Sequence, residues 1–99
     1  MTEKKEKRVF DITTLDTYAL LSLFMGILSE QAWQHMGLRV KPRTDKVEKD
    51  LEKARVAIDC VEFLIGKLEP YISTEEKNRL KWMLTDLQIN FARIQGEKG

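Results

Sequence analysis

Apolar residues recur mostly at spacings of three and four along three separate segments, and this period restricts the fold more than any other feature. Such spacing puts each set on one face of an α-helix, which turns about 100° per residue. Three amphipathic helices with short connections predict an all-α fold, a three-helix antiparallel bundle. The sets are Tyr18, Leu21, Met25, Leu28, Ala32 and Met36; Leu51, Ala54, Ile58, Val61, Ile65 and Leu68; and Leu80, Met83, Leu84, Leu87, Phe91 and Ile94.

Capping residues mark the ends of the first two helices. Thr14 or Asp16 can accept the free amide protons of the first turn of the first helix, and Asp50 is the preferred cap of the second. Gly37 can adopt the left-handed conformation that ends a helix. Pro42 lacks a backbone donor, so the segment around it is expected to form a loop.

The third helix has the clearest start. Ser73 stands three residues before Glu76 in "STEE", the spacing of a reciprocal capping box. Gly96 is expected to close this helix. The predicted organisation is a flexible charged tail followed by a single helical domain, with these bounds: tail 1–13, domain 14–96, helices about 15–36, 47–69 and 74–95.

All three helices carry large apolar residues on a second face, away from the core set. A single bundle of this size covers such faces poorly, and large exposed apolar patches usually mark interfaces. We therefore expect the bundle to be completed by homo-oligomerisation, with a dimer favoured. The candidate interface residues are Leu20, Leu23, Phe24, Ile27, Phe63 and Trp82.

The uncharged stretch from Thr17 to Ser29 is too short for a membrane span, which needs roughly 20 apolar residues. The amino-terminal segment does not have the order of a secretory signal. The single cysteine, Cys60, cannot form an internal disulfide, so a reducing compartment is the simpler assumption. These features predict a cytoplasmic protein that is not transmembrane.

Motifs that carry catalysis are not found: there is no glycine-rich phosphate loop, serine elbow or pair of histidines at metal spacing. The chain is predicted not to be an enzyme and to need no cofactor. Cys60 is interpreted as a packing residue, because thiol activation needs a neighbouring base or positive field. Four polar residues are interpreted as a polar seam between helices or subunits: His35, Arg55, Asp59 and Glu62.

The segment 39–49 holds five basic and two acidic residues, in a chain with a formal net charge of +1. With the charged tail, this loop could touch phosphates non-specifically. Nucleic-acid binders usually have a much stronger basic bias, so a solvated loop is the favoured interpretation and a nucleic-acid partner is unlikely. The candidate basic residues are Arg39, Lys41, Arg43 and Lys46.

The order of several short motifs is similar to that of the bacterial family DUF1844, a domain of unknown function. The resemblance runs from the first helix to the end of the third. It rests on His35, Gly37 and Leu38; Pro42; Ala54, Arg55, Ile58, Asp59 and Glu62; Ser73 to Glu76; and Leu84, Asp86 and Leu87. Ser73-Thr74 replaces the family's Thr-Pro start, and the segment around Pro42 is more basic. The resemblance implies a small helical cytoplasmic bacterial protein and implies no activity.

Together these observations predict a helical interaction module that binds itself or another protein through apolar helix faces. The alternative is a weak binder of nucleic acid or acidic surfaces through the basic tail and the loop 39–49.

Overall fold

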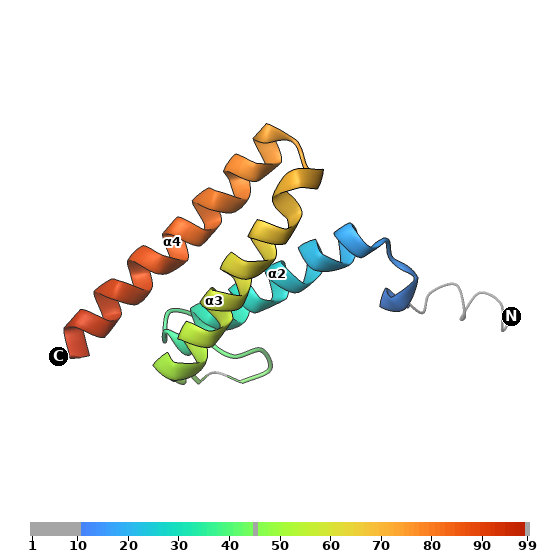
Figure 1. Ribbon diagram of the computed structural model, residues 1–99. Helices are drawn as coiled ribbons and strands as arrows, with labels where there is room; N and C mark the ends of the chain where they lie inside the picture. The colour runs from blue at the N-terminus through green and yellow to red at the C-terminus, as the bar shows by residue number, and fades with distance from the viewer. Residues whose placement is uncertain (1–10, 45, 99) are drawn as a thin grey trace, which may run out of the picture.

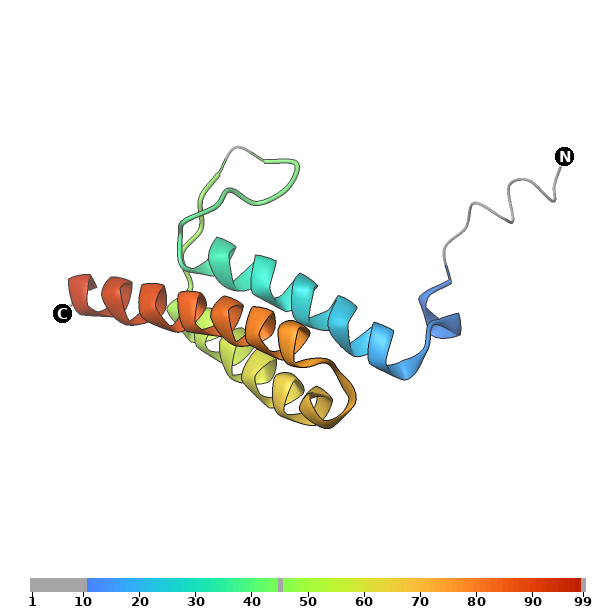
Figure 2. The ribbon, with the colours of Figure 1, turned by 90° about the horizontal axis from the view of Figure 1, so that it is seen from above.

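The protein is an all-α three-helix bundle, as the sequence predicts. The computed structural model describes residues 11–44 and 46–98. Helices α3 and α4 lie side by side and run in opposite directions, while α2 packs mainly against α3 (Figures 1 and 2). The elements in chain order are η1 (Ile12–Thr14), α2 (Thr17–His35), α3 (Leu51–Leu68), η2 (Glu69–Tyr71) and α4 (Thr74–Lys98).

Helix α2 begins after Asp16, whose carboxylate accepts a hydrogen bond of 2.9 Å from the Tyr18 N–H. Of the two caps that the sequence allows, Asp16 is therefore the one used. Residues 1–10 of the predicted tail lie outside the described residues. The last residues assigned to that tail belong to the 3₁₀ turn η1, where the Asp11 carboxylate accepts a bond of 3.0 Å from the Thr13 N–H.

The end of α2 is a Schellman motif. Gly37 has a φ of 82°, the left-handed conformation that a residue without a Cβ adopts readily. The Gly37 N–H donates to the Gln34 carbonyl at 3.0 Å, and the Leu38 N–H donates to the Trp33 carbonyl at 3.1 Å. Two otherwise unpaired carbonyls of the last turn are thereby satisfied, and the helix ends where the glycine predicted.

Helix α3 starts after the approximate bound of residue 47 and directly after Asp50, the cap that the sequence favours. The Asp50 carboxylate accepts from the Lys53 N–H at 3.1 Å, and the Asp50 φ of −147° is not helical, so the first helical residue is Leu51. Before α4, the Ser73 hydroxyl accepts from the Glu76 N–H at 3.1 Å. Within the part of the chain described, the reverse bond from the Ser73 N–H to Glu76 is not formed. The Glu76 carboxylate accepts instead from Arg79, with an Nε–Oε1 distance of 3.1 Å.

The prediction that Gly96 closes the last helix is wrong. Helix α4 continues through Gly96 to Lys98. A glycine in a helix costs about 1 kcal/mol relative to alanine, which the rest of a long helix can tolerate.

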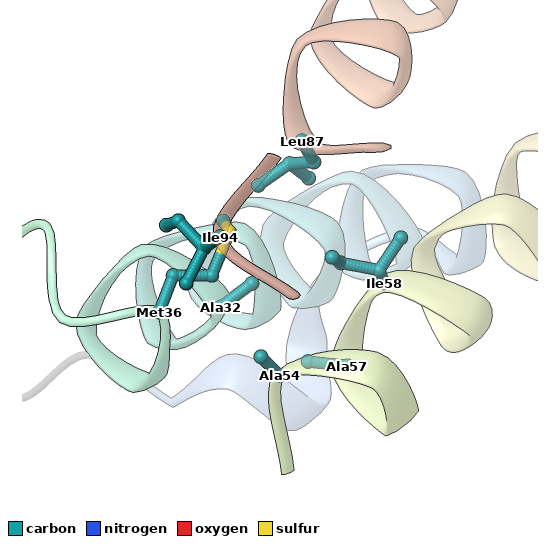
Figure 3. Packing of buried hydrophobic residues seen from close by; sticks show 7 residues of the cluster. All are labelled: Ala32, Met36, Ala54, Ala57, Ile58, Leu87 and Ile94. Carbon is teal, nitrogen blue, oxygen red and sulfur yellow. The ribbon is translucent and has the colours of Figure 1, made fainter. Parts of the chain in front are cut away.

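The core consists of two adjoining clusters of buried side chains. At one end α2 and α3 meet through Ala32, Ala54 and Ala57, whose small side chains allow close approach (Figure 3). Leu87 and Ile94 of α4 join this cluster, which also contains Met36 and Ile58. The other cluster contains Met25, Val61, Ile65, Leu68 and Leu80. Most buried residues belong to the predicted apolar sets, because those sets are the faces that the helices turn toward one another.

Gln34 departs from the sequence-based expectation. Gln34 is three residues from the exposed Gln31, a spacing that predicts a position on the same polar face, yet Gln34 is only 8% exposed. The connection between α2 and α3 folds back beside this part of α2, and a hollow there is lined by Gln34 together with Lys41 and Pro42. The path of the loop therefore explains this burial, and helical periodicity in the sequence gives no information about that path.

Candidate interaction surface

An open groove of about 630 Å³ runs between α2 and α3, and apolar side chains form most of its walls. Its lining residues are Phe24, Ile27 and Leu28 of α2, and Val56, Asp59, Cys60, Phe63 and Leu64 of α3. Three of these side chains are more than half exposed: Ile27 at 51%, Val56 at 53% and Phe63 at 63%. Contiguous exposure of this kind on a small protein marks a surface that another molecule can cover. We call it the α2–α3 groove.

The groove exists because the apolar surface of both helices is wider than their shared core. Met25 and Val61 fill the core face, and both are almost fully buried. Phe24 and Phe63 lie on neighbouring positions outside that face and remain exposed at 39% and 63%. The local sequence thus produces both the bundle and an uncovered apolar strip beside it.

Few charges border the groove. Asp59 is the charged residue among those that line it. The Lys67 Nζ lies 5.3 Å from the centroid of the Phe63 ring, within the range of a cation–π contact. A shallow hollow continues the groove toward the start of α3 and is lined by His35, Glu52 and Lys53, among others.

The six predicted interface residues do not form one patch. Phe24, Ile27 and Phe63 meet in the α2–α3 groove. Leu23 is half-buried and lines a second hollow, between α2 and the loop that follows it, which Ile27 also borders. Leu20 is half-buried on α2. 

Trp82 lies on another helix, α4, and is 75% exposed. It borders a separate shallow hollow with Ile89, Arg79 and Asp86.

The α2–α3 groove also contains residues that were not among the predicted interface residues, notably Cys60 and Leu64. Cys60 stands three residues before the predicted Phe63, a helical spacing that places both on the same face, and Leu64 directly follows Phe63.

The residues of the predicted polar seam are not brought together within the chain. Arg55 pairs with Glu52, at an Nη2–Oε2 distance of 2.8 Å, rather than with Asp59. The hydrogen bond that Glu52 accepts raises the pKa of the Arg55 guanidinium above its ordinary value. Asp59 and Glu62 are exposed, whereas His35 is half-buried at the end of α2.

The predicted basic loop holds much of its charge in local ion pairs. Arg39 pairs with Glu30, and its guanidinium lies 5.8 Å from the centroid of the Trp33 ring. The Lys41 Nζ lies 3.1 Å from Glu48 Oε1. These carboxylates reduce the positive field that a phosphate would meet.

The backbone of this loop is also ordered by hydrogen bonds. The Lys41 N–H donates to the Lys46 carbonyl at 3.1 Å, and the Asp50 N–H donates to the His35 carbonyl at 2.7 Å. The second bond ties the end of α2 to the start of α3. Arg43 and Lys46 are exposed on this loop, and Arg43 has a φ of 66°.

The match to a known family decides what kind of domain this is. The family model described as Domain of unknown function (DUF1844) matches residues 18–93. The chain belongs to the DUF1844 family. Comparisons with curated proteins and with solved structures found no match. The resemblance that the short motifs indicated is therefore confirmed.

The DUF1844 match includes every residue that lines the α2–α3 groove. Over residues 11–44 and 46–97, this DUF1844 domain has no group of three or more His, Cys, Asp or Glu side chains placed to hold a metal ion. None of its described helices is long and apolar enough to cross a membrane.

Proposed function

We propose that this DUF1844 protein is a non-enzymatic interaction module that forms a homodimer, with the α2–α3 groove of each copy covered by the other. The observation that carries the proposal is the exposure of Ile27, Val56 and Phe63 in one groove. Fully burying such a side chain is worth about 1.5–3 kcal/mol, and these side chains retain about half of that gain for an association.

A second copy is the partner that the charges on α3 favour. The exposed strip of α3, which runs from Glu52 through Val56 and Phe63 to Lys67, has the acidic residue toward its start and the basic residue in its last turn. A twofold-related copy presents the same charges in the opposite order, so one patch serves both chains. An unrelated protein partner is the second possibility, and it would use the same groove.

A cytoplasmic location belongs to the same proposal. Cys60 is a free, exposed thiol in the groove, and a reducing compartment would keep it in that state.

The experiment measures mass by sedimentation equilibrium or light scattering, with circular dichroism as a check on folding. The wild-type protein should have about twice the chain mass of 11.6 kDa. Phe63→Glu should give a helical monomer, because burying an unpaired carboxylate in an apolar interface is costly. Trp82→Glu is the matched control: it also replaces an exposed aromatic residue by glutamate, and it should remain dimeric.

A wild-type monomer at every concentration would contradict self-association. Dissociation by Trp82→Glu and not by Phe63→Glu would move the interface to α4.

Binding to nucleic acid or acidic surfaces remains the alternative, and the local ion pairs of Arg39 and Lys41 weaken it. Each phosphate contact would have to compete with Glu30 or Glu48. The test is fluorescence anisotropy with a mixed-sequence oligonucleotide across salt concentrations, since phosphate binding falls steeply with salt. We expect no saturable binding at physiological salt.

A further inference from the structure

The exposed strip of α3 has an internal symmetry that specifies how two copies would pair. Glu52, Val56, Cys60, Phe63 and Lys67 follow one another at spacings of four, four, three and four residues, so they share one face of the helix. All five are exposed. The face is acidic at its start and basic at its end. Its middle is apolar apart from Asp59, which stands three residues after Val56 and also lines the α2–α3 groove.

The positions on this face are balanced about one point. Val56 and Phe63 are equally distant from the midpoint between residues 59 and 60, and Glu52 and Lys67 are equally distant from the same midpoint. A twofold axis through that point would place the Val56 of one copy opposite the Phe63 of the other. It would also place each Glu52 opposite a Lys67.

We propose that the dimer is built on an antiparallel pairing of α3 with the α3 of a second copy, in the register that sets Glu52 against Lys67. This inference rests on the proposed function and deepens it, because it names the partner surface and the register. A parallel pairing in the same register would instead oppose Glu52 to Glu52 and Lys67 to Lys67. Like charges directly opposed at an interface are unfavourable, so the charge order selects the antiparallel arrangement.

The contacts that these charges make within one chain leave them available. Glu52 pairs with Arg55, but the side chains of both are more than half exposed, at 73% and 52%. Exposed ion pairs of this kind contribute little to stability. Lys67 covers the Phe63 ring with its ammonium group at 5.3 Å, so its charged end already lies over the apolar middle of the strip.

Helix α2 would complete the interface along one side. Ile27 and Phe24 face the same groove as Val56 and Phe63. A second α3 lying along the first would cover these α2 side chains as well. The two-faced character of α2 and the charge order of α3 are then explained by one arrangement.

The test uses disulfide cross-linking in a Cys60→Ser background. The double variant Glu52→Cys with Lys67→Cys should form a covalent dimer under mild oxidation, and each single-cysteine variant should not. A bridge within one chain is excluded, because fifteen residues of helix span about 22 Å and a disulfide joins Cα atoms about 6 Å apart. A single cysteine placed at Gln95, on α4, is the control for random collision.

Charge exchange gives an independent measurement of the same register. Glu52→Lys alone and Lys67→Glu alone should each weaken dimerisation about tenfold, because two attractive pairs become repulsive. The combined exchange should restore the wild-type dissociation constant. Glu97→Lys, the same charge change at the end of α4, should leave it unchanged.

The outcomes separate this inference from the proposed function. If the wild-type protein is a dimer and the single-cysteine variant Glu52→Cys cross-links by itself, the pairing is parallel and the proposed register is overturned. A wild-type dimer in which the double-cysteine variant does not cross-link and the charge exchange does not rescue would overturn it too. Either result leaves self-association standing, whereas a monomeric wild-type protein contradicts both.

Discussion

Replacing Gly37 by alanine should destabilise the protein by about 1–2 kcal/mol. Gly37 has a φ of 82°, and an L-residue in the left-handed region costs roughly that much. A Cβ at this position would lie 3.2 Å from Lys49 Cε and 3.6 Å from Lys49 Cβ. The shorter contact involves the far part of a flexible side chain that can move, so the backbone conformation dominates the cost.

The assay is thermal or chemical unfolding at one fixed protein concentration, since self-association would make the midpoint depend on concentration. A loss of 1 kcal/mol lowers the melting temperature of a domain this size by about 4–8 °C. The matched control is Gly66→Ala, in the interior of α3, where a Cβ would meet nothing within 4 Å. That change should stabilise the protein by about 0.5–1 kcal/mol. A Gly37→Ala variant that unfolds at the wild-type midpoint would refute the Schellman ending of α2.

Three further changes test helix ends and a local charge. Ser73→Ala should cost about 1 kcal/mol in unfolding free energy, because the Glu76 N–H loses its acceptor at the start of α4. Arg79→Gln should raise the pKa of the Glu76 carboxyl toward its ordinary value, measured by NMR titration, because the hydrogen bond from Arg79 lowers that pKa. Since the folded pKa is the lower one, the associated stability is present above the ordinary carboxyl pKa. It is lost as the pH falls through the depressed value, and the variant should lose less on acidification. Gly96→Ala should leave stability equal or raise it by up to about 0.5 kcal/mol, since Gly96 lies inside α4, and a marked loss would restore Gly96 as a helix terminator.

Local chemistry explains which parts of the fold could be predicted from the sequence. The Asp16, Asp50 and Ser73 caps and the Gly37 ending each depend on a few neighbouring residues. They can therefore be predicted from one sequence without knowledge of the tertiary fold. Gly96 did not follow the same rule as Gly37. A glycine permits a helix to end but does not require it.

Contacts between distant segments could not be predicted in the same way. Helical periodicity identified Phe24, Phe63 and Trp82 as lying outside the core sets, and all three are exposed. It could not show that Phe24 and Phe63 meet in one groove while Trp82 lies on α4 away from them. That distinction depends on how the helices pack, and the burial of Gln34 depends on the path of the loop.

Helix α2 provides a last prediction, because Ile27 lines both the α2–α3 groove and the loop-side hollow, whereas Leu23 lines the loop-side hollow and not the groove. Ile27 is 51% exposed and lines the α2–α3 groove, so Ile27→Glu should preserve helicity and weaken the dimer about a hundredfold or more. Leu23 lines the loop-side hollow, which also contains Lys41, a cation that could pair with a new carboxylate. Leu23→Glu should therefore keep the dimer, with at most a modest loss of stability. Sedimentation equilibrium and circular dichroism on the two single variants would separate these effects. Dissociation by Leu23→Glu, with Ile27→Glu remaining dimeric, would place the interface on the loop side of α2 and leave the α2–α3 groove without its proposed partner.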